Sequence, residues 1–328
     1  MLSEKKKNIL GQLLLLAATI LWGSSFSILK DTIDSVPNSF VLGVRFITAG
    51  LIFVLIFPKK LKMKKSTFFH GVIIGLCTAA AYIVQTFGLK YTTASKNAFL
   101  TAVYVVVVPF LTWLFYKKRP NVYNLIAAAL SAIGMLVICF GDGSGLQIGD
   151  LLSFGCSFFY ALQIIFLQKF NKEDDTTRLV MIYLLTVGVV NMIISAITEL
   201  PYTELVIDGK AWLAICYLAV ACTCLAQFFQ AQGQRFVSSD QAALILSLES
   251  VFGTLFAVVL WGEALTWNLI VGFVAIFIAI IISETKLSFI TKFFRKNKAP
   301  VSESADKISP EKNSDNQPED FSDENIKK

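Results

Sequence analysis

The sequence predicts an all-α membrane protein in which ten transmembrane helices form two inverted five-helix repeats, with both termini cytoplasmic. Three features lead to this fold class: the composition, a series of long apolar runs, and a similarity between the two halves of the chain. Of the 328 residues, 55% are hydrophobic and 16% are charged, and the mean hydropathy is +0.65. A soluble domain has about 25% charged residues. The composition therefore places the chain in the membrane class.

Each predicted span is an apolar run long enough to cross a hydrocarbon core about 30 Å thick. The runs cover residues 9–29, 40–57, 68–88, 95–116, 122–140, 151–168, 179–198, 211–231, 242–261 and 267–285. The first run is longer than a signal-peptide core and is followed by further spans, so it predicts a helix that is retained. Four prolines fall between the runs, where the missing N–H removes no helical hydrogen bond. They are Pro37, Pro58, Pro120 and Pro201.

The distribution of Lys and Arg in alternate loops predicts the orientation. Twenty of these residues lie on one side of the ten runs, the side that also carries both termini. Four lie on the other side, namely Lys30, Lys90, Lys96 and Lys210. Cytoplasmic loops carry the excess of positive charge, so both termini are expected in the cytoplasm. Residues 286–328 follow the last run and are predicted to form a disordered cytoplasmic tail, because the segment from Pro300 onward has almost no apolar residues.

The chain resembles itself when it is shifted by 145 residues, across the glycine-rich link of residues 141–145. This shift aligns Gln85 with Gln230 and Gly88 with Gly233, where each half has a helix end, a polar turn and the start of another helix. We therefore predict repeats at residues 9–140 and 149–285. Five spans per repeat is an odd number, so the second repeat enters the membrane from the opposite face. Transporters built in this way bind their substrate near the midplane, between the repeats.

Several short segments carry a resemblance to a known family. They are Leu21–Phe26 (LWGSSF), Leu42–Phe46 (LGVRF), Leu89–Ala94 (LKYTTA), Leu248–Phe252 (LESVF) and Trp261–Glu263 (WGE). Together they make the chain similar to EamA-type transporters of the drug/metabolite transporter superfamily, over about residues 9 to 285. The resemblance implies a ten-helix carrier, commonly an exporter of amino acids or other small metabolites. The chain departs from the family at Ser250, where a proline is usual.

Glu249 and Arg45 are the charged residues that lie within predicted spans and away from the first or last two residues of a span. Glu249 is near the middle of the run 242–261, and a charge at that depth normally faces a protein interior or a wet cavity. It is a candidate for proton coupling or gating, and the alternative is a carboxyl group that hydrogen-bonds a neighbouring helix as part of the packing. Arg45 is a second gating candidate, a few residues from the outer face. Its guanidinium either snorkels to the lipid headgroups, pairs with Glu249, or binds a substrate carboxylate.

Polar and aromatic residues inside the spans are the candidates for substrate binding. Amides offer donors and an acceptor without the full cost of a buried charge, and aromatic rings supply the apolar part of a pocket. The candidates are Trp22, Tyr82, Gln85, Tyr104, Tyr160, Gln163, Gln227 and Gln230. Phe26 and Asn191 are further polar or aromatic residues of this kind. For any one amide, an interhelical hydrogen bond is an equally good interpretation.

These features predict a secondary transporter of small metabolites, such as amino acids, that works by alternating access in the cell membrane and is a probable exporter. A passive channel of the same fold remains an alternative. An intramembrane enzyme would need a concentrated set of catalytic side chains, whereas the chain has one His, His70, and one acidic residue deep in a span. We therefore expect no enzyme activity.

The remaining expectations concern cofactors and partners. The six Cys residues all lie in apolar runs without metal-ligand spacing, and no nucleotide-binding GxxxxGK[ST] loop is present. We expect no cofactor or metal, and as partners a small-molecule substrate and the lipid bilayer. Nucleic acid is not expected, and the protein would act as a monomer or homodimer.

Overall fold

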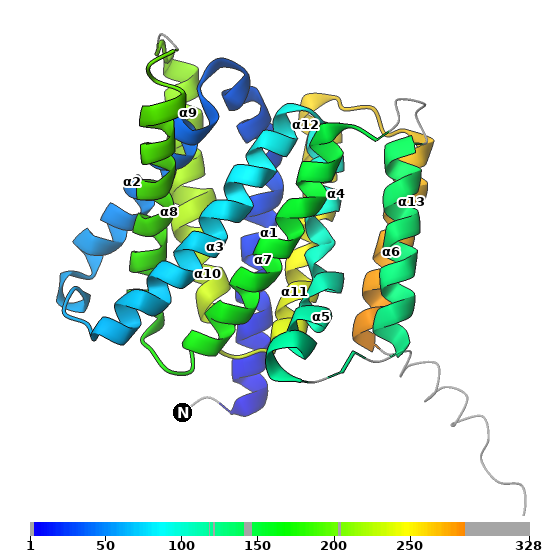
Figure 1. Ribbon diagram of the computed structural model, residues 1–328, viewed down its shortest axis with the longest axis horizontal. Coiled ribbons are helices and arrows are strands. Elements are labelled where there is room, and N and C mark those ends of the chain that lie inside the picture. Colours follow the sequence, from blue (N-terminus) through cyan, green and yellow to red (C-terminus); the bar gives the residue numbers. More distant parts are fainter. Residues whose placement is uncertain (1–2, 118, 121, 141–145, 203–204, 286–328) are drawn as a thin grey trace, which may run out of the picture. The chain divides into compact units, whose positions relative to one another are not determined.

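A computed structural model describes residues 3–117, 119–120, 122–140, 146–202 and 205–285 (Figure 1). Throughout these ranges the regular secondary structure is helical, without strands. The glycine-rich link at 141–145 and the predicted tail at 286–328 lie outside the described residues.

The first part of the chain contains six α-helices and one short 3₁₀ turn. They are α1 (Glu4–Ser35), α2 (Asn38–Ile56), η1 (Pro58–Lys60), α3 (Lys65–Lys90), α4 (Ala94–Ala102), α5 (Tyr104–Tyr116) and α6 (Val122–Phe140). The remaining elements are α7 (Ile148–Phe170), α8 (Thr176–Thr198), α9 (Gly209–Tyr217), the π-helix η2 (Leu218–Leu225), α10 (Ala226–Gly233), α11 (Ser239–Ser247), α12 (Glu249–Trp261) and α13 (Trp267–Thr285).

Among the described residues, eight helical segments are long and apolar enough to cross a membrane. One of them joins α4 to α5, another joins α9 to α10 through η2, and a third joins α11 to α12. Helices α6 and α13 contain shorter apolar segments, Leu125–Gly134 and Trp267–Ala279. The bounds of these two helices coincide with the predicted spans 122–140 and 267–285.

Two spans that the sequence predicted as continuous are broken near their middle. Val103 interrupts the first between α4 and α5, with φ −61° and ψ −13°. Leu248 interrupts the second between α11 and α12, with φ −62° and ψ −12°. The second break lies 145 residues after the first (248 against 103), which is the shift that aligns the two halves of the sequence. The break at Leu248 forms although Ser250 replaces the proline usual in the family.

The span from α9 to α10 is also irregular, because its central eight residues form the π-helix η2. The Thr223 hydroxyl donates a hydrogen bond to the Leu218 carbonyl, five residues earlier, at 2.8 Å. The indole Nε1 of Trp22 on α1 donates to the Cys222 carbonyl at 2.8 Å. Such π segments are rare and are frequent at functional sites. Here the segment gives α1 a hydrogen-bond acceptor in the middle of a span.

The helices pack in pairs that join the two halves of the chain. α2 packs along α8, α6 along α13, α3 along α7 and α8, and α1 along α10 and α12. In Figure 1, α2, α8 and α9 lie together on one side of α1, α3 and α7, whereas α6 and α13 lie on the other. The interior therefore sits between segments that are far apart in the sequence.

Hydrogen bonds tie the helix ends together on the side that the charge distribution assigns to the cell exterior. The ammonium of Lys30 on α1 donates to the carbonyl oxygens of Leu89 and Thr92 at the end of α3, at 2.7 and 3.0 Å. The carboxylate of Glu199 accepts hydrogen bonds from the first backbone N–H groups of α2, those of Ser39 and Phe40, at 2.9 and 3.0 Å. These contacts satisfy backbone groups that a helix end leaves unpaired.

We expect the substitution Gly23→Ala to destabilise the protein by about 1–3 kcal/mol, as overpacking does in other cores. A Cβ at Gly23 on α1 would overlap the Cβ of Phe252 on α12 and would lie 2.9 Å from the backbone nitrogen of Gly253. The matched control is Gly155→Ala on α7, where the nearest atom, Cγ1 of Val84, lies 3.9 Å from the added Cβ. There the helix propensity of Ala should raise stability by up to about 1 kcal/mol. Unfolding in detergent monitored by tryptophan fluorescence measures both, and equal effects would contradict the close α1–α12 contact.

Candidate functional site

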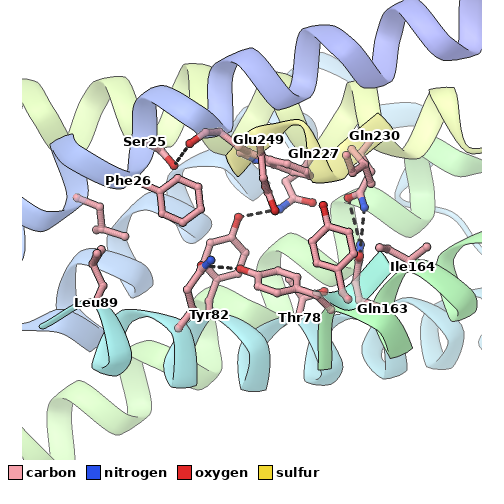
Figure 2. A pocket seen from close by; sticks show the side chains of 16 residues that line it. Ser25, Phe26, Thr78, Tyr82, Leu89, Gln163, Ile164, Gln227, Gln230 and Glu249 are labelled. Carbon is pink, nitrogen blue, oxygen red and sulfur yellow. Dashed lines mark hydrogen bonds between the residues drawn. The ribbon is translucent and has the colours of Figure 1, made fainter. Parts of the chain in front are cut away.

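A narrow cavity lies at the centre of the helices and is bounded by the spans that contain α1, α3, α5, α7, α10 and α12 (Figure 2). Its volume is about 30 Å³, room for about two water molecules. All eight substrate-binding candidates line it, together with Glu249. The other lining residues are Ser25, Phe26, Leu29, Thr78, Leu89, Ile164 and Leu246.

Glu249 reaches the cavity because it is the first residue of α12, directly after the break at Leu248. Its exposed fraction is 6%. Tyr104 occupies the equivalent place after the break at Val103, as the first residue of α5, and its hydroxyl interacts with Glu249. The two helix breaks thus direct an acid and a phenol toward each other.

Hydrogen bonds fix the amides of Gln85 on α3 and Gln227 on α10, which both line the cavity. The Gln85 amide nitrogen donates to the hydroxyl of Thr101 at 3.1 Å, and the Tyr160 hydroxyl donates to the Gln85 carbonyl oxygen at 2.7 Å. The Gln227 amide nitrogen donates to the hydroxyl of Tyr82 at 3.2 Å. Both amides therefore line the cavity and join helices at the same time, so the two interpretations of the sequence are compatible.

Gln163 and Gln230 form a reciprocal pair at one end of the cavity (Figure 2). Each amide nitrogen donates to the other residue's carbonyl oxygen at 3.2 Å, across the interface between α7 and α10. Phe26 and Leu89 lie at the opposite end. The cavity thus has an amide end and an apolar end.

Arg45 lies in the interior, so the prediction that it snorkels to the headgroups is wrong. Its exposed fraction is 0%. The Nε donates to the Thr223 hydroxyl at 2.7 Å, and the guanidinium carbon lies 5.4 Å from the ring centroids of Phe46 and Tyr82. The side chain is held between α2, η2 and α3 by its contacts with Thr223 and Tyr82, away from the lipid headgroups.

Arg45 also makes no ion pair with Glu249 among the described residues, whose three ion pairs involve other side chains. Within the same ranges its Nη1 and Nη2 find no hydrogen-bond partner. The side chain does not line the cavity directly but lies behind Tyr82, which does. It is therefore a buried positive charge next to the cavity wall.

One polar residue singled out in the sequence does not line the cavity, and two lining residues were not predicted. Asn191 is buried in α8, where its amide nitrogen donates to the Val187 carbonyl at 2.9 Å, and it does not line the cavity. Ser25 and Thr78 line it but were not predicted. Each lies one or two helical turns from a candidate on the same helix, and this spacing is the signal that could have identified them.

His70 forms a contact outside the cavity, on the side predicted to be cytoplasmic. Its Nδ1 lies 2.6 Å from a carboxylate oxygen of Asp174, and its ring stacks on Phe170 with centroids 3.9 Å apart. Ligand atoms of His70, Glu173 and Asp174 lie within 4.8 Å of one another, a spacing that could hold a metal ion. Asp174, however, already bonds both His70 and Thr67, so the group is a link between α3 and the turn that follows α7.

Comparison with known proteins identifies the family. Residues 9–140 and 147–285 match the EamA-like transporter family. A transporter of Archaeoglobus fulgidus described as uncharacterized is 30% identical over 285 residues, which cover 87% of this chain and 89% of that protein. The uncharacterized transporter YvbV of Bacillus subtilis is 26% identical over 286 residues, 84% of this chain and 91% of its own length.

A solved crystal structure shares the fold. It superposes with a TM-score of 0.67 over 85% of this chain and 98% of the other, at 15% sequence identity. The family match covers both halves of the chain, and the helices are long and apolar enough to cross a membrane. The chain therefore belongs to the EamA-like transporter family and is a multi-pass transporter of the cell membrane.

Proposed function

We propose that this transporter is a secondary carrier of small metabolites that works by alternating access. In this proposal ten spans form two inverted repeats, residues 9–140 and 149–285, and both termini are cytoplasmic. The carrier moves solutes such as amino acids or related compounds, with export as the physiological direction. It acts as a monomer or homodimer and has no enzymatic function.

The observation that carries the proposal is that residues 145 positions apart meet at the cavity. Tyr104 interacts with Glu249, and Tyr82 bonds Gln227. Equivalent residues of two repeats contact each other only near the axis that relates the repeats. The paired helices support the same axis, because α2 packs on its equivalent α8, and α6 on its equivalent α13. A substrate site between inverted repeats lies at this position.

The lining chemistry supports a small solute with both polar and apolar parts. Four glutamines offer donors and acceptors, and the rings of Trp22, Tyr82, Tyr104 and Tyr160 supply apolar surface. Among the described lining residues Glu249 is the one charged group, which disfavours polyanions. The cavity, with a volume of about 30 Å³, has to widen before such a solute enters. Alternating access requires such a change.

Glu249 and Arg45 have separate roles in this proposal. Glu249 takes up and releases a proton, or binds the ammonium group of the solute, because it is the carboxyl group in the cavity wall. Arg45 acts as a gating residue, because it joins α2 to the π-helix η2 through Thr223 and supports Tyr82 from behind.

The test is flux in proteoliposomes that contain the purified protein, measured against a panel of radiolabelled amino acids and related metabolites. The expected result is saturable uptake of at least one compound, stimulated by the same compound preloaded on the opposite side. Flux that does not saturate and shows no countertransport would identify a passive channel instead. No flux of any compound by folded protein would contradict the proposal.

A further inference from the structure

A second cavity opens on the side of the molecule that the charge distribution assigns to the cytoplasm. Its volume is about 420 Å³. It lies between the start of α1, the end of α7 and the turn that joins α10 to α11. The lining residues are Glu4, Lys7, Gln168, Asn171, Lys172, Gln234, Arg235, Phe236 and Val237. We refer to it as the basal cleft.

Two buried amides in the wall of the basal cleft have polar atoms without a hydrogen-bond partner. Gln234 is 1% exposed, and within the described part of the chain neither its Nε2 nor its Oε1 has a hydrogen-bond partner. Asn171 is 8% exposed; its Nδ2 donates to the Ala231 carbonyl, whereas its Oδ1 has no partner in the same ranges. Buried polar groups are nearly always paired. The unpaired amide of Gln234 and the unpaired amide oxygen of Asn171 beside one cavity point to a polar ligand or its water.

The charges around the basal cleft favour an anion. Among the described lining residues, three are cations, Lys7, Lys172 and Arg235, and one is an acid, Glu4. Glu4 already pairs with Lys7 at 2.6 Å. Lys172 and Arg235 form no ion pair with a described residue. With Glu4 paired to Lys7, Lys172 and Arg235 leave the cleft with excess positive charge, which concentrates anions.

A row of amides connects the basal cleft to the central cavity. Gln234, the residue directly after α10, follows Gln230 by four residues, and Asn171 directly follows α7. Residues four apart share one face of a helix, so the amides of Gln230 and Gln234 lie on the same side. The reciprocal pair of Gln163 and Gln230 closes the end of the central cavity where this row begins (Figure 2). Gln230 lines the cavity and Gln234 lines the cleft, so the same type of side chain continues from one to the other.

We propose that the basal cleft is the cytoplasmic mouth of the transport path and binds an oxyanion, a carboxylate or phosphate, of the solute before the Gln163–Gln230 pair opens. Lys172 and Arg235 attract the oxyanion, and the amide of Gln234 donates to it. The role as a mouth rests on the carrier function proposed above. The binding of an oxyanion does not, so the two can fail separately.

The test places a thiol in the basal cleft with Gln234→Cys and compares its reaction with two methanethiosulfonate reagents of similar size, one anionic and one cationic. The full-length protein is held in nanodiscs of phosphatidylcholine, and modification is followed by peptide mass spectrometry, which separates this thiol from the native cysteines. The anionic reagent should react about tenfold faster than the cationic one. The pair K172Q/R235Q should abolish this preference, and the charge-conserving pair K172R/R235K should keep it. Asn171→Cys repeats the measurement if Gln234→Cys does not fold.

Competition then identifies the source of the oxyanion. Sodium phosphate and sodium acetate should each slow the labelling at least about threefold relative to sodium chloride. The ionic strength is kept equal, so charge screening alone does not produce this decrease in rate. Protection by phosphatidylglycerol in the disc, without protection by the free anions, would assign the cleft to a lipid headgroup and overturn its role as a mouth. Equal rates for the two reagents would overturn oxyanion binding altogether. Labelling needs no flux, so a failed transport assay leaves this result interpretable.

Discussion

Replacing Glu249 with Gln is expected to reduce transport by at least about tenfold while the protein stays folded. The substitution keeps the size of the side chain and its contact with Tyr104 but removes the carboxylate from the cavity wall. A hydrogen bond to a charged group contributes about 1.5–3 kcal/mol, and each 1.4 kcal/mol corresponds to about tenfold. The measurement is the initial rate of countertransport in proteoliposomes at several external pH values, with the thermal midpoint of unfolding as the measure of folding.

Two variants serve as controls for the Glu249→Gln experiment. Glu249→Asp keeps the charge but withdraws it by one methylene, so it should retain part of the activity and its dependence on pH. Tyr104→Phe removes the hydroxyl and leaves the carboxylate, so it should lower the rate less than Glu249→Gln does. Unchanged transport and unchanged pH dependence in Glu249→Gln would mean that this side chain only packs the helices.

Replacing Arg45 with Met should separate stability from transport. The guanidinium is buried, and within the described residues only its Nε has a hydrogen-bond partner, the hydroxyl of Thr223. Removing such a charge in favour of an apolar side chain of similar length is often neutral or stabilises by about 1–4 kcal/mol. We therefore expect the thermal midpoint to stay equal or rise. Transport should fall by at least about tenfold, since a link worth about 1.5–3 kcal/mol between α2 and η2 is lost.

Thr223→Val provides the matched control for Arg45→Met. It removes the acceptor of the Arg45 hydrogen bond with little change in volume and keeps the positive charge, so it should reduce transport but also lower stability. Arg45→Lys keeps the charge without the planar group that lies against Phe46 and Tyr82. If transport simply followed stability across these variants, Arg45 would be a structural residue and not a gating one.

The sequence predicted the helical spans well because hydropathy reports directly on the lipid that surrounds them. Eight predicted runs overlap segments that are long and apolar enough to span a membrane. The breaks were not predicted, because Val103 and Leu248 carry none of the Gly or Pro signals that mark a helix end. The break in each half lies inside an apolar run, where tertiary packing decides the backbone geometry.

The cavity lining could be predicted because an amide or acid within a span is costly unless it faces the protein interior. All eight predicted substrate-binding residues lie around the cavity, and their role in binding remains a prediction. Arg45 could not be placed in the same way. Its distance from the end of α2 suggested a route to the headgroups, but its burial depends on the neighbouring elements η2 and α3, whose residues Thr223 and Tyr82 contact it. The basal cleft was missed because Gln234 and Asn171 lie at helix ends, where polar residues carry no such signal.

The breaks at Val103 and Leu248 also change which segments move together. The pieces α4 and α12 pack on each other, and so do α5 and α11. In the predicted orientation, α4 and α12 form a pair on the outer side of the breaks, and α5 and α11 form a pair on the inner side. The two pairs meet at the level of Glu249. In the alternating-access carrier proposed above, we expect each break to act as a joint that lets one of these helix pairs tilt while the other stays in place, with α2–α8 and α6–α13 as the stationary part. In this arrangement, the cavity would open through two small bends, one in each broken span, and no complete span would have to move.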